Sequence, residues 1–156
     1  MSIVRFNIRV YILLLDESKT RVLLSDEIIG GKYFTKFPGG GLEYGEGIID
    51  CLHREALEEL GQEVEVARHF YTTEFLQISR FIPGDQIVSV YYECCLPKNT
   101  DGRRLPSFRV TNKKFDFVEV KEREESFRWQ TFKKLNKEEM SFPIDREVVS
   151  RLKKGN

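Results

Sequence analysis

Three glutamates stand close together in the segment Phe37–Gly61, a short distance after a glycine-rich turn. Glu55, Glu58 and Glu59 follow one another at i, i+3 and i+4, so an α-helix would place their carboxylates on one side. Like charges at these spacings weaken a helix by about a few tenths of a kcal/mol per pair. A hard divalent cation, which prefers oxygen ligands, would offset that repulsion. The spacing therefore indicates a metal site.

The same cluster has a plainer interpretation, because clustered glutamates most often form the solvated face of an amphipathic helix. Two features favour the metal. No lysine is interleaved among the three carboxylates. In addition, Glu59 overlaps the edge of the apolar arc of this helix and Glu55 lies just outside it, where an unpaired carboxylate loses hydration at a high cost. Arg54 can pair with one of these carboxylates but not with all of them.

The turn Pro38–Gly41 also allows two interpretations. A tight turn needs glycine even where no ligand binds. Glycines equally let backbone groups come close to a phosphate or a metal ion. By itself the turn is a weak signal, but its fixed distance from the glutamate helix makes it part of a stronger one.

The spacing of these residues is the third observation. The chain reads Gly40, five residues, Glu46, seven residues, and then the run Arg54-Glu55-Ala56-Leu57-Glu58-Glu59-Leu60-Gly61-Gln62. This pattern resembles the Nudix box, the signature of the Nudix (MutT-like) hydrolases, at every charged and glycine position. Ala56 and Gln62 stand where bulky aliphatic residues are usual. The resemblance is strong over residues 37–62 and only architectural elsewhere.

The resemblance implies hydrolysis of a nucleoside diphosphate linked to another group X, with Mg²⁺ as cofactor and Mn²⁺ as its substitute. The implied metal ligands are Glu55, Glu58, Glu59 and the Gly40 carbonyl. Arg54 would orient the carboxylates through a salt bridge, and Glu46 would support the site. We assign the general base to Glu58, although in the family this role moves between box and loop glutamates.

The group X is not specified, so a nucleoside triphosphate and a nucleotide sugar both stay open as the substrate. The short motifs associated with coenzyme A and NADH pyrophosphatases are not evident. The alternative is a non-catalytic Nudix-like domain that serves as a nucleotide-binding sensor. All glutamates of the box are retained, which favours the enzyme.

The elements that position these residues follow from apolar periodicity. Val4–Leu14 alternates with a period of two, which predicts a strand whose polar face carries Arg5 and Arg9. Arginine forks match phosphate oxygens, so either one is a candidate for substrate binding, although arginines on such a face are more often merely solvated. Lys36, just before the glycine turn, is a third candidate with the same plain alternative.

The remaining sequence predicts a mixed sheet with one central and one terminal helix. The further strands are expected at Arg21–Ser25, Tyr33–Phe37, Val64–Gln77 with a break near Arg68 and His69, Ile87–Leu96 and Phe127–Phe132; the terminal helix is expected at Ile144–Leu152, with Asp145 as its N-cap. This inventory predicts an α+β fold, an α/β/α sandwich with a mixed β-sheet, which resembles the Nudix fold.

The polar stretch 97–125 is the least regular part of the chain. A hairpin between residues 108–110 and 115–118 is one arrangement for it. So long a connection is unusual in a compact domain, which suggests a lid, a substrate loop or a dimer contact; a variable surface excursion explains it as well. A homodimer therefore stays open.

Length and composition limit the number of domains, the partners and the compartment that we expect. A chain of 156 residues predicts a single domain over residues 1–156. Its formal net charge of zero gives no indication of nucleic acid or of a membrane surface as a partner. The apolar run Val10–Leu15 is too short to span a bilayer, and no signal-peptide pattern is present. Three cysteines without metal-site spacing argue against a disulfide framework and for the cytoplasm.

Overall fold

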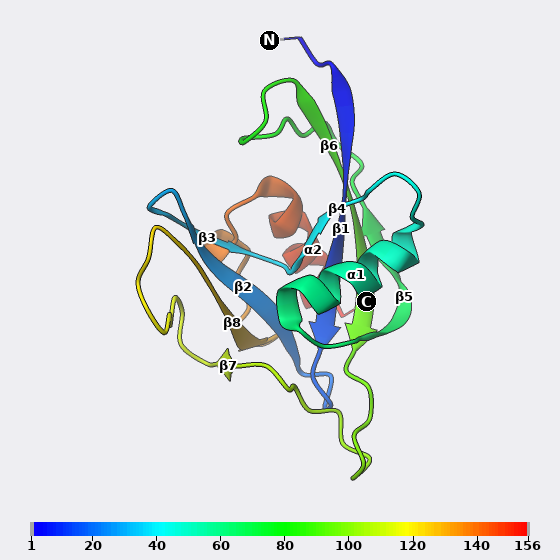
Figure 1. The fold of residues 1–156 in the computed structure, drawn as a ribbon, viewed down its shortest axis with the longest axis vertical. Coiled ribbons are helices and arrows are strands. Elements are labelled where there is room, and N and C mark those ends of the chain that lie inside the picture. Colours follow the sequence, from blue (N-terminus) through cyan, green and yellow to red (C-terminus); the bar gives the residue numbers. More distant parts are fainter. Residues whose placement is uncertain (1, 156) are drawn as a thin grey trace.

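The computed structural model describes residues 2–155 and consists of a mixed β-sheet between two α-helices (Figure 1). The elements are β1 Arg5–Leu15, β2 Arg21–Ile29, β3 Lys32–Lys36, β4 Gly39–Gly41, α1 Ile48–Leu60, β5 Glu65–Thr72, β6 Asp85–Cys95, β7 Val110–Thr111, β8 Arg123–Thr131, the 3₁₀ turn η1 Lys137–Glu139 and α2 Pro143–Lys153. The sheet order is β5-β6-β1-β2-β8-β7, with β3 against β2 and β4 against β1. β1–β6 and β7–β8 are parallel and the other pairs antiparallel.

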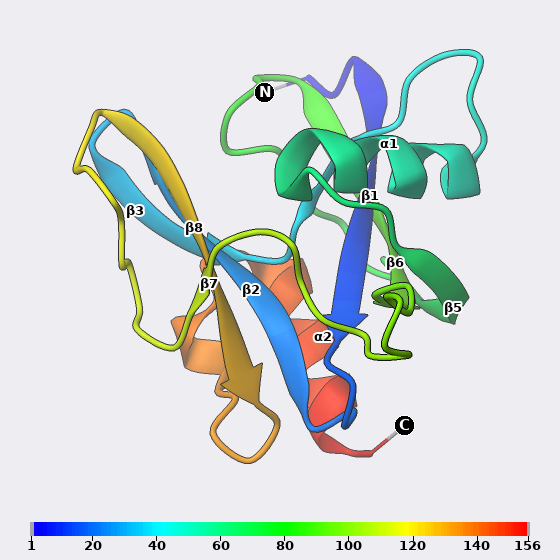
Figure 2. The same ribbon diagram turned by 60° about the horizontal axis from the view of Figure 1, so that its bottom comes forward.

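The two helices cover opposite faces of this sheet (Figures 1 and 2). Alternation along β1 explains how one strand serves both cores. Val10, Ile12 and Leu14 face the core under α1, whereas Leu13 and Leu15 face the core under α2. The predicted α/β/α sandwich with a mixed sheet is therefore confirmed.

The sheet opens into two arms beyond the turn that joins β1 to β2. These strands pair only where Leu15 meets Val22. Farther along, β1 pairs with β4 and β6, whereas β2 pairs with β3 and β8. A cavity lies between the arms, with Arg9 of β1 and Glu27 of β2 in its wall. The arms thus hold side chains from distant segments around one space.

Glycines allow the tight passage from β4 to α1. Gly39 has φ +154°, and a Cβ atom there would overlap the backbone of Val10 and the side chain of Tyr11. At the start of α1 the Asp50 carboxylate accepts a hydrogen bond from the Gly47 N–H at 3.0 Å. The helix ends at Gly61, whose left-handed φ of 66° is the geometry of a glycine C-cap.

Most predicted strands are present, and their bounds differ most next to the charged residues. β2 continues to Ile29 rather than ending at Ser25, and β8 begins at Arg123 rather than Phe127. Charged side chains interrupt the apolar alternation at these positions, because they face the cavity and not an apolar core. β5 ends at Thr72, and its two bulges stand at the break predicted near Arg68 and His69.

Two local predictions are wrong. No hairpin joins residues 108–110 to 115–118; only β7 is extended there, and it pairs in parallel with β8. Asp145 is not the N-cap of α2, because that helix begins at Pro143 after Phe142. The Asp145 carboxylate instead accepts a hydrogen bond from the Tyr91 hydroxyl at 2.5 Å. None of the helices within residues 2–155 has the length and apolar character needed to cross a bilayer.

Candidate active site

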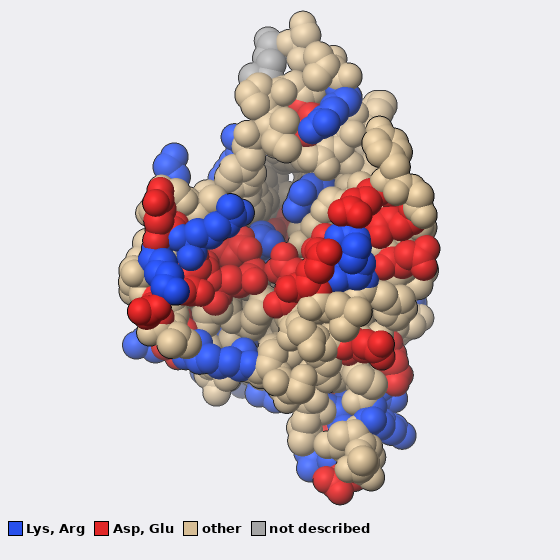
Figure 3. Space-filling view, in the orientation of Figure 1, with Lys and Arg blue, Asp and Glu red and all other residues tan. Residues whose placement is uncertain are grey.

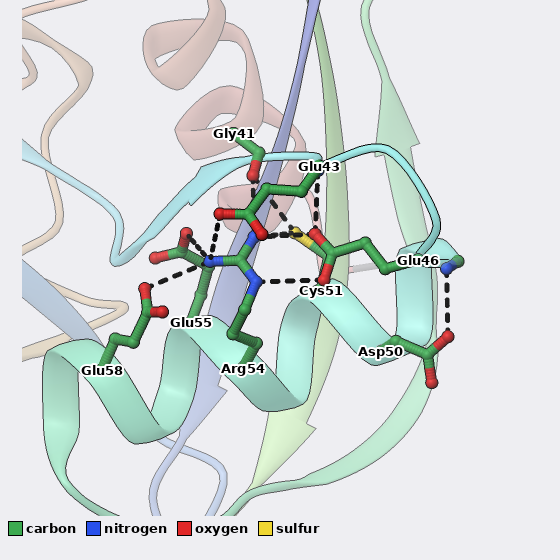
Figure 4. A network of polar contacts seen from close by, with 9 residues as sticks. Gly41, Glu43, Glu46, Asp50, Cys51, Arg54, Glu55 and Glu58 are labelled. Atoms are coloured by element: carbon green, nitrogen blue, oxygen red, sulfur yellow. Dashed lines mark hydrogen bonds and ion pairs between the residues drawn. The ribbon is translucent and has the colours of Figure 1, made fainter.

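Arg54 on α1 is the centre of a dense polar network (Figure 4). Its Nε and Nη2 donate to the two carboxylate oxygens of Glu46 at 3.0 and 2.7 Å. Nη2 also donates to the Gly41 carbonyl at 2.9 Å. Nη1 donates to Glu55 at 2.9 Å and to Glu58 at 3.1 Å. One guanidinium thus joins the loop before the helix to two glutamates of the helix.

The fork geometry of Arg54 has electrostatic consequences. Its hydrogen bonds lower the pKa of Glu46 to about 2, so this carboxylate stays ionised and paired. The pKa of Arg54 is raised in turn, chiefly by the same bond to Glu46. Arg54 and Glu46 therefore form a fixed ion pair, which holds the loop against α1.

Glu55 is the buried carboxylate of the box, with 7% of the residue exposed. It lies against Gly40, where a Cβ atom would overlap the carboxylate. Burial raises the pKa of Glu55, and the hydrogen bond from Arg54 opposes that shift. The glycine turn therefore leaves room for a carboxylate that the helix directs toward the sheet.

Glu59 belongs to a second group of carboxylates, whose other two members lie outside the box. One oxygen each from Glu27 of β2, Glu59 of α1 and Glu125 of β8 lie within 4.8 Å of one another. Figure 3 shows acidic side chains gathered between α1 and the strands of this arm, beside a hollow in the surface. The group therefore brings together a helix and two strands that are far apart in sequence.

This three-glutamate cluster fits a divalent cation. Glu27 and Glu125 are directly opposite each other in the antiparallel β2–β8 pair, a position where like charges destabilise a sheet. The Oε2 atoms of Glu27 and Glu59 are buried and accept no hydrogen bond from residues 2–155. Burial, together with Glu27 and Glu59, raises the pKa of Glu125 to about 10. A group of carboxylate oxygens that repel one another, some of them without a hydrogen-bond donor, supplies the ligand atoms that Mg²⁺ and Mn²⁺ prefer.

Two neighbours lie against this cluster. The hydroxyl of Ser25, which is fully buried, donates to Glu125 Oε2 at 2.8 Å. Lys36 Nζ lies 3.6 Å from Glu27 Oε1. Each of them reaches the cluster from the strand arm and not from the helix.

The adjoining cavity has a volume of about 380 Å³ and runs from the cluster toward α2. Glu27, Glu59, Lys36 and Arg9 line one part of it. The Nε of Arg9 donates to the Tyr11 hydroxyl at 2.9 Å. Apart from Arg80, Arg123 and Asp145, the rest of the lining is apolar, aromatic or uncharged polar, and it includes Ile78, Phe81, Ile87, Ser89, Phe142 and Ile144. The cavity thus has a charged part and a part suited to an aromatic ring.

The predicted site residues divide into groups. Glu46, Glu55 and Glu58 surround the guanidinium of Arg54, whereas Glu59 lies in the three-glutamate cluster. Gly40 lies against Glu55, and both Arg9 and Lys36 line the cavity. Arg5 does not line it; its side chain is 61% exposed and donates to Asp85 at 2.6 Å.

Sequence reasoning missed Glu27 and Glu125. Glu27 lies beyond the predicted end of its strand, and Glu125 lies before the predicted start of the last strand. The available signal was spacing: Glu27 comes two residues after the predicted strand end at Ser25, and Glu125 comes two residues before the predicted strand start at Phe127. Their approach follows from the register of β2 on β8, which local periodicity does not determine.

The model of the NUDIX domain family matches residues 5–152. A comparison with curated protein sequences gave no match.

Several solved structures have the same fold. A MutT NUDIX hydrolase from Burkholderia pseudomallei is 18% identical with a TM-score of 0.63, and the alignment covers 94% of this chain and 98% of that chain. A MutT protein from Methanosarcina mazei Go1 is 16% identical with a TM-score of 0.65, over 96% and 94% of the two chains. The E. coli ORF135 protein is 17% identical with a TM-score of 0.63, over 95% and 89%.

Proposed function

Because the chain belongs to the NUDIX domain family and is a Nudix pyrophosphohydrolase, we propose that it cleaves a phosphoanhydride bond in a nucleoside diphosphate linked to a further group X. We propose Mg²⁺ as the cofactor, with Mn²⁺ as a substitute. The observation that carries this proposal is the cluster of Glu27, Glu59 and Glu125, in which two buried oxygens have no hydrogen-bond donor among residues 2–155.

The proposed metal ligands come from both sides of the cluster. Glu59 joins Glu27 and Glu125, and it extends from the helix that also carries Glu55 and Glu58. The helix glutamates and the Gly40 carbonyl remain part of the proposed ligand set. When bound, a divalent cation neutralises phosphate charge and activates water for attack.

The remaining charged residues would act on the substrate or on the ligands. Arg9 and Lys36 line the cavity beside the glutamates and would hold phosphate oxygens. Arg54 fixes the direction of Glu55 and Glu58 through Nη1, so it is a positioning residue. Glu58, which is the more exposed of these two carboxylates, stays our assignment for the general base.

The cavity supports a nucleotide-type small molecule as substrate. Its volume of about 380 Å³ is within the range of small-molecule sites. Phe81 and Phe142 line the part toward α2 and would contact an aromatic base. We propose a nucleoside triphosphate or a nucleotide sugar as the substrate.

The experiment is a panel of nucleoside triphosphates and nucleotide sugars, assayed for release of a nucleoside mono- or diphosphate with and without Mg²⁺ or Mn²⁺. We expect metal-dependent cleavage of at least one compound and its loss in Glu59→Gln. Glu63→Gln, at an exposed position just beyond α1, is the control and should retain activity. Cleavage that persists in Glu59→Gln or without metal would contradict the proposal. Nucleotide binding without turnover would favour the sensor.

Three broader proposals accompany this function. Residues 1–156 would form a single domain, which the single sheet and its two helical layers support. The enzyme would act in the cytoplasm on a small molecule, without nucleic acid or membrane as a partner. Its three cysteines are free thiols, which suits a reducing compartment. A homodimer remains a prediction that gel filtration with light scattering would test.

A further inference from the structure

Lys36 is a buried cation that faces the three-glutamate cluster. It lies on β3 opposite Ser25 of β2. Its side chain is only 13% exposed, and that of Glu27, its nearest carboxylate, is 14% exposed. Burial alone would lower the pKa of Lys36, but Glu27, Tyr11, Glu59 and Glu125 outweigh burial and raise it. Lys36 therefore keeps its charge inside the site.

The contact between Lys36 and the cluster is loose. The distance of 3.6 Å from Nζ to Glu27 Oε1 allows an ion pair but is too long for a good hydrogen bond. The second oxygen of Glu27 and one oxygen of Glu59 have no donor within residues 2–155. One ammonium thus compensates part of the charge of three carboxyl groups without being held by any of them.

The position of Lys36 also gives it a second target. It lines the same cavity as Arg9, in which the phosphates of a substrate would lie. A doubly charged ion among the glutamates would supply the compensating charge and would repel the ammonium. The four-carbon stem of lysine is flexible, so its charge can turn from the carboxylates to an anion in the cavity.

We propose that Lys36 has two successive roles. It is the counter-ion of the three-glutamate cluster in the metal-free enzyme, and it becomes a phosphate-binding residue once a divalent cation binds to the cluster. The second role rests on the function proposed above, whereas the first does not. The proposal requires opposite effects from removal of the charge. The metal should bind more tightly and the nucleotide more weakly.

The test uses Lys36→Met, which keeps an unbranched apolar stem of similar length without the ammonium. Titration of the nucleotide-free protein with Mn²⁺, followed by electron paramagnetic resonance, should give a Kd lower by about tenfold. The metal-free variant should melt at a lower temperature and gain more than the wild type when Mg²⁺ is added. With the nucleotide that the wild type cleaves, KM should rise more than kcat falls.

Lys32→Met is the matched control, because Lys32 lies at the exposed end of the same strand. It should change neither the Mn²⁺ affinity nor KM. Lys36→Arg keeps the charge and should bind Mn²⁺ as the wild type does, which provides a measurement if Lys36→Met does not fold.

The outcomes separate the two proposals. A folded Lys36→Met that binds Mn²⁺ with unchanged or lower affinity overturns the counter-ion role, because a residue that only packs would weaken metal and nucleotide together. An unchanged KM overturns the phosphate role. If the wild type binds Mn²⁺ but cleaves no nucleotide, the proposed function fails while the Mn²⁺ titration still decides the counter-ion role.

Discussion

Glu27 and Glu125 stand opposite each other on β2 and β8, and their carboxylate oxygens lie within 4.8 Å of each other and of Glu59. A cross-strand pair of acids is unfavourable unless a cation or a proton is shared between them. The pair therefore extends the predicted metal site from the helix to the sheet. A metal-binding role for Glu27 and Glu125 can therefore be tested by substitution, as it can for the glutamates of the box.

Glu125→Gln should weaken Mn²⁺ binding strongly. Loss of a residue that only supports a metal ligand lowers metal affinity by about tenfold to hundredfold, and we expect a larger loss here. The reason is that an amide keeps the shape of the side chain but supplies a weaker, uncharged ligand. Isothermal titration with Mn²⁺ measures the change. Glu124→Gln is the matched control, since adjacent strand residues point to opposite faces. Equal losses in both variants would mean that Glu125 has no specific role.

Ser25→Ala should weaken metal binding by about tenfold while leaving the fold intact. Its hydroxyl donates to Glu125 Oε2 at 2.8 Å, so its removal frees that carboxylate to rotate. The control is Ser126→Ala, which removes another buried hydroxyl, one that donates to the Asp116 carbonyl. The prediction is refuted if both variants bind Mn²⁺ as tightly as the wild type.

Metal affinity should increase with pH. Glu125, whose pKa is raised to about 10 in the metal-free protein, holds a proton at neutral pH, and a cation must displace it. One displaced proton corresponds to about a tenfold gain in affinity per pH unit between pH 7 and 9. Calorimetry of Mg²⁺ binding in two buffers of different ionisation enthalpy would count the proton. In Glu125→Gln this proton release should be absent.

The same raised pKa has a consequence for stability. The folded state binds the proton of Glu125 more tightly than the unfolded state does. The contribution is therefore fully present below the ordinary pKa of 4.5, declines as the pH rises above it, and is gone above about 10. Metal-free protein should unfold at a lower urea concentration at pH 10 than at pH 7, and saturating Mg²⁺ should reduce this difference.

Arg54→Lys should destabilise the protein by about 1–3 kcal/mol, because lysine cannot reproduce the fork that binds Glu46 and the Gly41 carbonyl. The free energy of unfolding in urea measures this cost. Arg103→Lys changes an exposed ion pair with Glu17, for which about 0–1 kcal/mol is expected. If the two variants lost equal stability, the network around Arg54 would have no special importance.

Arg9 and Arg5 should respond differently to substitution. Arg9→Ala should raise KM for the cleaved nucleotide by about tenfold or more, because it removes a charge from the cavity. Arg5→Ala should leave KM unchanged and lower stability, because it leaves the buried Asp85 with fewer partners. Steady-state kinetics and urea unfolding of both variants decide. A raised KM in Arg5→Ala would place substrate contacts outside the cavity.

The sequence predicted what depends on neighbours along the chain. The helix of the box, its glycine cap and the face shared by Glu55, Glu58 and Glu59 follow from residues three and four apart. The alternation in β1 likewise predicted a polar face with Arg5 and Arg9, of which Arg9 lines the cavity and Arg5 does not. The strand ends at Ser25 and Phe127 were wrong because alternation fails where a polar face is buried against a site.

By itself, then, the sequence determined the family, the sandwich and the glutamate helix, since these rest on local spacing. Only the tertiary structure decided that the Glu59 carboxylate lies beside Glu27 and Glu125, whereas Glu55 and Glu58 accept hydrogen bonds from Arg54. The physical reason is strand register. A shift of one residue between β2 and β8 would place Glu27 and Glu125 on opposite faces of the sheet, and no pattern within either strand specifies that pairing.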